Sequence, residues 1–392
     1  MAEAREFDMV IYGATGFTGR LVAEYMNTAH PGRAGTWAMA GRSADKLAAV
    51  RDEMGLPADT PLIVANADEP ETLKAMAERA KVICTTVGPY TLYGEPLVKA
   101  CVEAGTDYVD LSGEPLWMRE MIETYDSRAK ETGARIVHSC GFDSIPFDLG
   151  VAFAQEKAKE KFGAFAPHVA GRVRKMEGTF SGGTAASGRA TMAKVQENPA
   201  LLAHLTSPFC LTPGFEGAEQ PQMSKPKQDP DGTWAAPFFM AVINTKNVHR
   251  SNVLNGLPFG EGFQYDEMIS TAPGEQGKAA AEAIASVDPM GGGGSGGPKP
   301  GEGPSKEERE AGHYDLLFTA DMGDGRSLKA GVTGDKDPGY GSTSKIIAEA
   351  GLFLADGHAK VGGGVYTPGA AFGTALVPAL VERAGMSFEV EN

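Results

Sequence analysis

A glycine-rich heptapeptide near the start of the 392-residue chain carries the clearest chemical signal. Its residues are Gly13, Ala14, Thr15, Gly16, Phe17, Thr18 and Gly19. In this spacing the first glycine permits a tight turn, the second lets the backbone approach a pyrophosphate, and the third lets a helix pack closely on a sheet. The N–H groups at the start of that helix then face the anion. The heptapeptide therefore predicts a dinucleotide-binding turn between a strand at 7–12 and a helix at 20–28.

Arg42 indicates which dinucleotide is bound. An NAD site usually has an Asp or Glu at the end of the second strand, where it binds the ribose hydroxyls. This sequence has Arg42 and Ser43 there, with Lys46 close behind, and the first carboxylate is Asp45. A guanidinium binds a phosphate through two parallel hydrogen bonds. We therefore expect Arg42, Ser43 and Lys46 to bind the 2′-phosphate of NADP(H).

The ends of the third and fourth strands complete the expected cofactor site. In a doubly wound sheet, ligands lie outside the carboxyl ends of the strands. We expect adenine beside the residues that end the third strand, and the nicotinamide ribose beside those that end the fourth. These residues are Asn66, Ala67, Asp68, Thr86, Val87, Gly88, Pro89 and Tyr90.

The catalytic acid is less clearly marked. None of the ten tyrosines has a lysine four residues later, so the Tyr–Lys pair of short-chain reductases is absent. Tyr93 follows the fourth strand, where its hydroxyl could donate a proton or bind an oxyanion. Asp143 follows the sixth strand and is the second catalytic candidate, the alternative being a cap for the helix after Pro146. Other acids of the region, for which capping or a place in the core is the alternative, are Tyr90, Glu114, His138 and Cys140.

Strands and helices alternate over the first 140 residues, which predicts right-handed βαβ units and a parallel sheet. The strands are apolar without alternation, as expected when both faces of a sheet are covered. The expected strands are 7–12, 37–40, 62–65, 82–87, 108–111 and 135–139. The expected helices are 20–28, 44–54, 70–80, 95–104 and 118–132. The predicted fold class is thus α/β, with a Rossmann-type doubly wound parallel sheet.

A second region of α+β character follows the first. Expected strands at 178–181, 237–245 and 314–320 indicate a mainly antiparallel sheet, and helices are expected at 337–356 and 372–384. The glycine-rich run 290–304 is an expected flexible insert. We therefore predict a Rossmann NADP-binding domain at 1–146, a substrate or oligomerisation domain at 147–335, and C-terminal helices at 336–392 that return to the first domain.

Composition and charge exclude several other functions. The chain has 36 basic and 51 acidic residues, and this balance argues against a nucleic-acid partner. No two of the four cysteines have CxxC spacing, so we expect no metal site and free thiols in the cytoplasm. The uncharged stretch 361–381 holds five glycines and two prolines, so we expect no transmembrane segment. Peripheral contact with a membrane stays open, and a homodimer is the expected assembly.

Longer motifs resemble a known family. VGPYTLYGEPLVKACVEAGTDYVDLSGE at 87–114 and CGFDSIPFDLG at 140–150 are similar to the saccharopine dehydrogenase-like oxidoreductases, most closely to their trans-acting enoyl reductase branch. SGGTAAS, GDKDPGYGSTSK and GGGVYTPGAAFG also match. The resemblance implies a Rossmann domain, an α+β substrate domain, and reduction of the carbon–carbon double bond of polyketide-derived lipid intermediates. The phosphate motif GxxGxxG and the lack of an arginine cluster depart from true saccharopine reductases and count against saccharopine as the substrate.

Three hypotheses follow. The first is an NADPH-dependent reductase of an unsaturated, hydrophobic small molecule, free or linked to a carrier protein or to coenzyme A. The second is an imine-forming amino acid dehydrogenase of the saccharopine type. The third is a non-catalytic NADP-binding sensor or lipid-associated scaffold. The uncharged segments 237–245 and 364–373 favour an apolar ligand over an amino acid, although core strands have the same composition.

Overall fold

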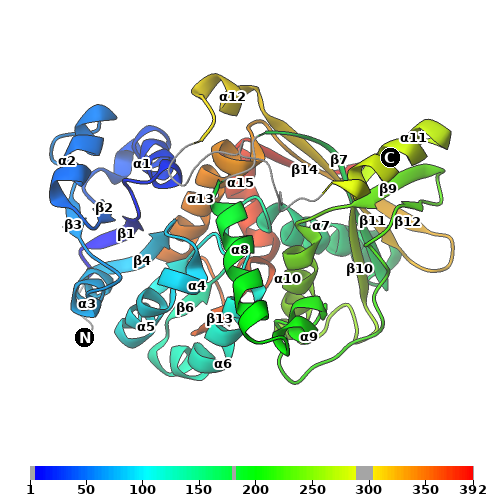
Figure 1. Cartoon of the computed structure of the whole chain (residues 1–392), viewed down its shortest axis with the longest axis horizontal. Coiled ribbons are helices and arrows are strands. Elements are labelled where there is room, and N and C mark those ends of the chain that lie inside the picture. Colours follow the sequence, from blue (N-terminus) through cyan, green and yellow to red (C-terminus); the bar gives the residue numbers. More distant parts are fainter. Residues whose placement is uncertain (1–4, 179–181, 288–302, 392) are drawn as a thin grey trace.

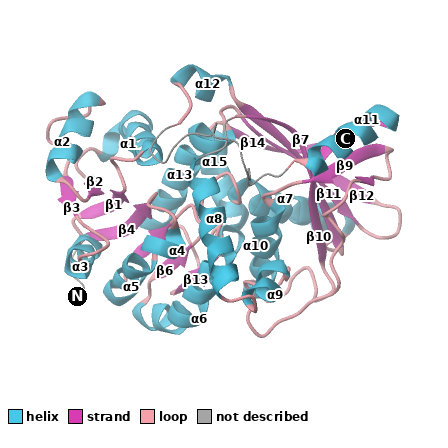
Figure 2. Cartoon of the chain, in the orientation of Figure 1, coloured by secondary structure: helices cyan, strands magenta, loops and turns pink. Residues whose placement is uncertain are grey.

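Two β-sheets lie side by side with helices between them (Figures 1 and 2). The computed structural model describes residues 5–178, 182–287 and 303–391. Most of the first sheet is blue to cyan in Figure 1, and the second sheet lies at the opposite end of the molecule. Within the described residues each sheet has seven strands.

The first sheet is wholly parallel and follows the order β13-β6-β5-β4-β1-β2-β3. Its strands are β1 (Phe7–Tyr12), β2 (Trp37–Gly41), β3 (Leu62–Val64), β4 (Ala80–Thr85), β5 (Asp107–Val109), β6 (Arg135–Val137) and β13 (Gly364–Tyr366). Every residue of β2 is buried, as expected for a strand covered on both faces. From β1 the chain adds β2 and β3 on one side, and β4, β5 and β6 follow on the other side. The order of the strands therefore reverses between β1 and β4, which creates the topological switch point where such folds bind ligands.

Among the helices that connect these strands, some begin at proline and some end at glycine. They are α1 (Phe17–Ala29), α2 (Ala44–Glu53), α3 (Pro70–Arg79), α4 (Tyr90–Tyr93), α5 (Glu95–Ala104) and α6 (Pro115–Thr132). Proline at the first position starts α3 and α6, where no N–H is needed. Gly105 and Gly133 end α5 and α6 in the left-handed conformation, with φ of 65° and 85°. The predicted Rossmann-type α/β fold is confirmed.

The second sheet is mixed and mainly antiparallel, in the order β14-β12-β11-β7-β10-β9-β8. Its strands are β7 (His168–Glu177), β8 (Lys227–Gln228), β9 (Thr233–Pro237), β10 (Gln264–Pro273), β11 (His313–Asp321), β12 (Ser327–Gly334) and β14 (Met386–Glu391). Only β7 and β10 pair in parallel among these strands. The predicted strand 314–320 corresponds to β11.

Helices that follow β6 in the chain lie between the two sheets (Figure 2). They include α7 (Ile145–Phe162), α8 (Gly182–Glu197), α9 (Leu201–Thr206), α10 (Ala241–Leu254), α13 (Thr343–Ala355), α14 (Pro368–Ala371) and α15 (Val377–Arg383). Helix α11 (Gly274–Ser286) contacts β9 and β10, and α12 (Lys306–Ala311) contacts the short turn η2 (Pro338–Ser342). Further short turns occur at η1 (Pro31–Arg33) and η3 (Gly373–Leu376). Helix α7 contacts β11 and β12, whereas α13 contacts β1, β4 and β5.

The C-terminal segment contributes to both sheets. Strand β13 pairs with β6 in the first sheet, and β14 pairs with β12 in the second. The sequence did not predict β14, because the expected last element was a helix at 372–384, which the structure divides into η3 and α15. No helix among the described residues is long and apolar enough to cross a membrane.

The predicted strand at 237–245 is wrong over most of its length. Strand β9 ends at Pro237, and the chain then enters α10. A short apolar run does not distinguish a buried strand from a buried helix. The polar residues Asn244, Asn247 and Ser251 have helical spacing, and all three make buried hydrogen bonds with residues at the start of α7.

Two other predicted segments fall where little is described. In the predicted strand 178–181, residue 178 follows the end of β7 as a bend, and residues 179–181 lie outside the described part of the chain. The predicted flexible insert 290–304 also lies outside it, except for its last two residues.

Candidate functional site

The phosphate-binding turn between β1 and α1 needs glycine at two positions. Gly13 has a φ of 95°, which disfavours a side chain, and a Cβ there would lie 2.8 Å from Val87 Cγ2 and 2.9 Å from Thr86 Oγ1. A Cβ at Gly19 would collide with the carbonyl of Gly13. The turn therefore packs tightly between the start of α1 and the residues that follow β4.

The first turn of α1 remains open to an anion. The N–H groups of Gly13 and Ala14 donate to the carbonyl of Ala40, at 3.0 and 3.1 Å, which fixes the turn against β2. Gly16 is the N-cap of α1 and provides no side-chain hydrogen bond to the helix. Because the first N–H groups of a helix have no partner within it, this end attracts negative charge. The turn thus has the shape and the donors that a pyrophosphate requires.

Arg42 supplies an unpaired positive charge beside this turn. It is exposed, and among the described residues it makes no ion pair or hydrogen bond. Ser43 Oγ accepts from Lys46 N at 3.3 Å and caps α2, while the Lys46 side chain is exposed. Burial raises the pKa of Tyr12. The positive charge of Arg42 acts to lower this pKa, and the negative charge of Asp68 acts to raise it. Arg42 and Asp68 therefore lie near the Tyr12 hydroxyl, at the ends of three adjacent strands.

The residues after β3 and β4 line the same edge of the sheet. Asn66 N donates to Thr72 Oγ1 at 3.0 Å, and Asp68 N donates to Asn66 Oδ1 at 3.3 Å, so hydrogen bonds within the chain hold the turn that contains Ala67. Thr86 N donates to Tyr12 O at 3.0 Å, which joins the ends of β4 and β1. Val87, Gly88 and Pro89 follow before α4 begins.

Tyr90 is the predicted cofactor residue whose large polar side chain is buried. Its hydroxyl donates to Thr85 O at 3.3 Å and accepts from Leu111 N at 3.0 Å. Burial raises the pKa of this hydroxyl well above its usual value. The side chain thus fastens the end of β4 to the residues after β5, and its backbone remains the part that can face a ligand.

Glu114 caps α4. Its carboxylate accepts from Tyr90 N and Thr91 N, both at 2.8 Å, and from Ser187 Oγ of α8 at 2.6 Å. Capping was the structural alternative for this residue. The three bonds also attach α8 to the loops at the carboxyl edge of the first sheet.

His138 and Cys140 are buried beneath that edge. His138 Nδ1 lies 2.7 Å from Asp110 Oδ2, and the ring packs edge-on against Trp117 with 5.0 Å between centroids. Its Nε2 atom has no partner among the described residues. Burial raises the pKa of the Cys140 thiol well above its usual value. Both side chains thus occupy the core, which was the alternative to a catalytic role.

Of the two catalytic candidates, Asp143 has the more unusual surroundings. It is half-buried, and its carboxylate has no hydrogen bond among the described residues. Ser144 is the N-cap of α7, and no side chain caps that helix, so Asp143 does not act as its cap. Burial raises the pKa of Asp143 to about 6. A carboxyl group that titrates near neutral pH is suited to proton transfer.

Tyr93 lies in α4 with 45% of its surface exposed. Its hydroxyl makes no hydrogen bond among the described residues. It follows β4, whereas Asp143 follows β6, and β5 lies between these strands. The two strand ends are therefore about 10 Å apart, at about 4.8 Å per strand. A small substrate can span this distance.

Residues from the C-terminal segment also reach this edge, and no role was predicted for them. The N–H of Phe142 donates to Thr343 Oγ1 at 3.0 Å, and the ring of Phe17 packs edge-on against Tyr340 with 4.8 Å between centroids. Both partners belong to the motif GDKDPGYGSTSK. Its glycine-rich, hydroxyl-rich composition was the available signal, but nothing local indicated where it folds.

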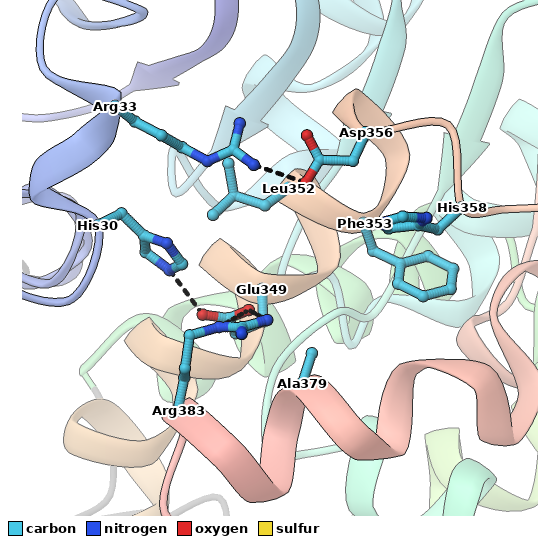
Figure 3. A pocket seen from close by; sticks show the side chains of 9 residues that line it. All are labelled: His30, Arg33, Glu349, Leu352, Phe353, Asp356, His358, Ala379 and Arg383. Carbon is cyan, nitrogen blue, oxygen red and sulfur yellow. Dashed lines mark hydrogen bonds and ion pairs between the residues drawn. The ribbon is translucent and has the colours of Figure 1, made fainter.

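A cavity of about 280 Å³ lies at the opposite edge of the first sheet (Figure 3). Arg33, in its wall, donates to Asp8 at the start of β1 at 3.1 Å and to Asp356 at 2.6 Å. Glu349 is 2% exposed and bonds to His30 at 2.7 Å and to Arg383 at 3.1 Å. The charges of this cavity are paired with one another, and it joins α1, α13 and α15 away from the phosphate-binding turn.

The carboxyl edge of the first sheet thus has a glycine turn shaped for a pyrophosphate and an unpaired arginine after the second strand. A free carboxyl group lies at the same edge. The chain is an NADP-dependent oxidoreductase, and its cofactor is NADP(H). Residues 9–137 match the family model described as the saccharopine dehydrogenase NADP binding domain.

The chain belongs to the saccharopine dehydrogenase-like family, in the trans-acting enoyl reductase branch, as the motifs predicted. The trans-acting enoyl reductase of Mycobacterium bovis is 39% identical over 404 residues, covering 96% of each chain. A Mycobacterium tuberculosis protein that carries this name provisionally is 41% identical over 422 residues, covering 99% of this chain and 98% of its own. Saccharopine dehydrogenase (L-Glu forming) of Saccharomyces cerevisiae has the same fold, with a TM-score of 0.54 at 11% identity over 98% of this chain and 99% of that one.

Proposed function

We propose that this protein uses NADPH to reduce the carbon–carbon double bond of an α,β-unsaturated carbonyl compound with a hydrophobic chain. The observation that carries the proposal is the unpaired, half-buried carboxyl group of Asp143 at the carboxyl edge of the first sheet. Its raised pKa, about 6, keeps a proton available near neutral pH. The names of the relatives support the same reaction type.

Each part of the reduction has a place at this edge. NADPH, when bound, supplies the hydride that the β-carbon accepts. In our proposal the phosphate-binding turn and Arg42 hold the cofactor, and the Asp143 carboxyl group gives its proton to the α-carbon. Tyr93 donates a hydrogen bond to the carbonyl oxygen, where negative charge develops during the reaction. Hydride and proton together saturate the double bond, and solvent returns the proton to Asp143.

Exposed apolar side chains on two neighbouring helices support a hydrophobic substrate. Leu92 and Tyr93 of α4 are 61% and 45% exposed, and Met192 of α8 is 42% exposed. Helices α4 and α8 contact each other, and Glu114 bonds to both. We propose that the acyl chain lies across these helices, with the thioester carried on coenzyme A or on a carrier protein. The expected homodimer remains a proposal that sedimentation of the purified protein tests.

The arginines of the second sheet and of α10 count against a dicarboxylate substrate. Arg172 forms ion pairs with Asp229 and Asp266, and Arg174 with Asp315 and Glu391. The guanidinium of Arg250 donates to the carbonyls of Leu211 and Val365. Arg172 and Arg174 are therefore already engaged by carboxylates, which disfavours the imine-forming amino acid dehydrogenase. Arg250 has no carboxylate partner, and its buried Nε atom has no hydrogen bond among the described residues.

A substrate panel tests the proposal. Purified protein is mixed with NADPH and, separately, with an enone, an enoyl thioester and a cyclic imine, and NADPH oxidation is followed by absorbance. We expect oxidation with the thioester and the enone. Oxidation with the imine alone would replace the proposal by the amino acid dehydrogenase. Tight NADPH binding without oxidation in any mixture would favour the sensor or scaffold.

A further inference from the structure

The turn η2 contacts the phosphate-binding turn through one aromatic pair. The Tyr340 ring meets Phe17 edge-on, with 4.8 Å between centroids and 72° between ring planes. Phe17 is the first residue of α1 and the fifth residue of the glycine-rich heptapeptide. Its backbone therefore belongs to the anion-binding helix start, while its ring points toward the C-terminal half of the chain.

Two more groups from the C-terminal half hold the same ring. The Arg309 guanidinium of α12 lies 5.4 Å from the centre of the Phe17 ring, and the backbone at Gly303 approaches so closely that a Cβ would collide with the ring. Asp337 N donates to Arg309 O at 3.0 Å, which ties α12 to the start of η2. The Phe17 ring is thus enclosed by segments that are themselves joined.

Thr343, which directly follows η2, makes a hydrogen bond to the loop that carries Asp143. Thr343 Oγ1 accepts from Phe142 N at 3.0 Å and donates to Pro338 O at 2.8 Å, and Thr343 is buried. The Phe142 ring packs against Tyr314 with 4.5 Å between centroids. The Tyr314 hydroxyl lies 3.0 Å from Ser342 Oγ, within η2. One short turn therefore contacts both the phosphate-binding turn and the residue before Asp143.

We propose that η2 couples the cofactor site to Asp143. The positioning residues are Phe17, which contacts Tyr340 in the middle of η2, and Thr343, which directly follows η2. Cofactor phosphates that order the start of α1 restrain the Phe17 ring, and this restraint passes through Tyr340, Pro338 and Thr343 to the Phe142–Asp143 loop. The coupling itself is a property of the chain. Only its consequence for proton transfer rests on the proposed role of Asp143.

Hydrogen exchange with NADPH as the probe tests the coupling without a substrate. Amide exchange in the peptide covering 140–147 is measured with and without saturating NADPH. We expect NADPH to slow this exchange at least fivefold in the wild-type protein and in Thr343→Ser, which keeps the hydroxyl. In Thr343→Val, which has the same shape without the hydroxyl, we expect less than a twofold effect although NADPH is bound. Full NADPH-dependent protection in Thr343→Val would overturn the proposal.

Phe17→Leu tests the contact between α1 and η2. It also provides a second test of the coupling if Thr343→Val fails to fold. The NADPH concentration is raised until the cofactor site is full, and we again expect NADPH to slow exchange at 140–147 by less than twofold. NADPH-dependent protection as large as in the wild-type protein would contradict the proposed path through η2.

Activity separates the two proposals. If the protein reduces an enoyl thioester, Thr343→Val should lower kcat about tenfold with less than a twofold change in the Kd for NADPH, and Thr343→Ser should restore kcat. Loss of coupling in the exchange experiment with normal kcat would show that η2 does not serve Asp143. A protein that is coupled but inactive with every thioester would refute the proposed function and leave the coupling intact.

Discussion

The Tyr25 hydroxyl donates a 2.8 Å hydrogen bond to Glu349, a carboxylate that lies 324 residues further along the chain. This bond joins α1, next to the phosphate-binding turn, to α13 in the C-terminal segment. His30 and Arg383 bind the same carboxylate, so one buried side chain connects α1, α13 and α15. Burial alone would raise the pKa of Glu349, but hydrogen bonds from His30, Arg383 and Tyr25 lower it below its usual value.

Glu349→Gln should therefore destabilise the protein by about 1.5–3 kcal/mol at pH 7, because it weakens the hydrogen bonds that this buried carboxylate accepts from Tyr25, His30 and Arg383. A lowered folded-state pKa means that the stabilising effect is complete above the unfolded value, about 4.3, and is lost as the pH falls through the folded value. The difference between wild type and variant should thus shrink in acid. Urea unfolding at several pH values measures it.

The matched control for Glu349 is Glu382→Gln. Glu382 pairs with the same Arg383, but its side chain is 72% exposed. An exposed pair contributes at most about 1 kcal/mol, so we expect a small effect at every pH. Equal losses for the two variants would show that Glu349 is not a buried joint.

Arg42→Ala should weaken NADPH binding about 10- to 100-fold and leave NADH binding unchanged. Hydrogen bonds to a charged group contribute about 1.5–3 kcal/mol, and the unpaired guanidinium is available to a 2′-phosphate that NADH lacks. Fluorescence titration with both cofactors measures the two dissociation constants. Arg79→Ala is the control, since Arg79 pairs with Glu6 at the far edge of the sheet. An equal loss of both cofactors in Arg42→Ala would refute its phosphate role.

Gly19→Ala should raise the Kd for NADPH at least tenfold. The added Cβ meets the Gly13 carbonyl and must push α1 away from the turn, a form of overpacking that costs about 1–3 kcal/mol. Gly32→Ala provides the comparison, because a Cβ at Gly32 has nothing within 4 Å. Normal NADPH binding by Gly19→Ala would mean that the turn is not pressed against its neighbours as described.

Asp143→Asn should lower kcat about 10²- to 10⁴-fold, the usual contribution of a positioned acid. The pKa of Asp143 is raised to about 6, so the acid carries its proton below that pH. Wild-type activity should fall as the pH rises through this value, and Asp143→Asn should lack that decline. Tyr93→Phe should lower kcat less and keep the pH profile. If Tyr93→Phe removes the decline and Asp143→Asn does not, the two residues exchange roles.

The glycine turn between β1 and α1 could be predicted from sequence because its requirements are local, whereas the cofactor contacts of its residues remain predictions. Gly13 adopts a positive φ and Gly19 packs against the Gly13 carbonyl, and both requirements lie within the seven-residue turn. Arg42 directly follows the end of β2, and β1 and β2 are apolar runs that end at or next to a glycine. The expected bounds of β1 and α5 are those of the structure.

The catalytic half could not be predicted in the same way, because its partners come from distant segments. Nothing near Asp143 in sequence indicates that Thr343 holds the preceding residue, 201 positions away from it. The prediction of a strand at 237–245 was wrong for a related reason. Its composition fits a core strand, whereas its place between two sheets and the bonds of Asn244 to Ser144 and Glu267 belong to a helix.

The most direct test of the proposed function is the fate of the transferred hydride. The protein is supplied with NADPH deuterated at C4 of the nicotinamide and with an enoyl thioester, and the product is analysed by mass spectrometry and NMR. We predict a saturated thioester with one deuterium at the β-carbon and a solvent-derived proton at the α-carbon. Deuterium at the carbonyl carbon, or an unchanged thioester while an imine is reduced, would contradict the account.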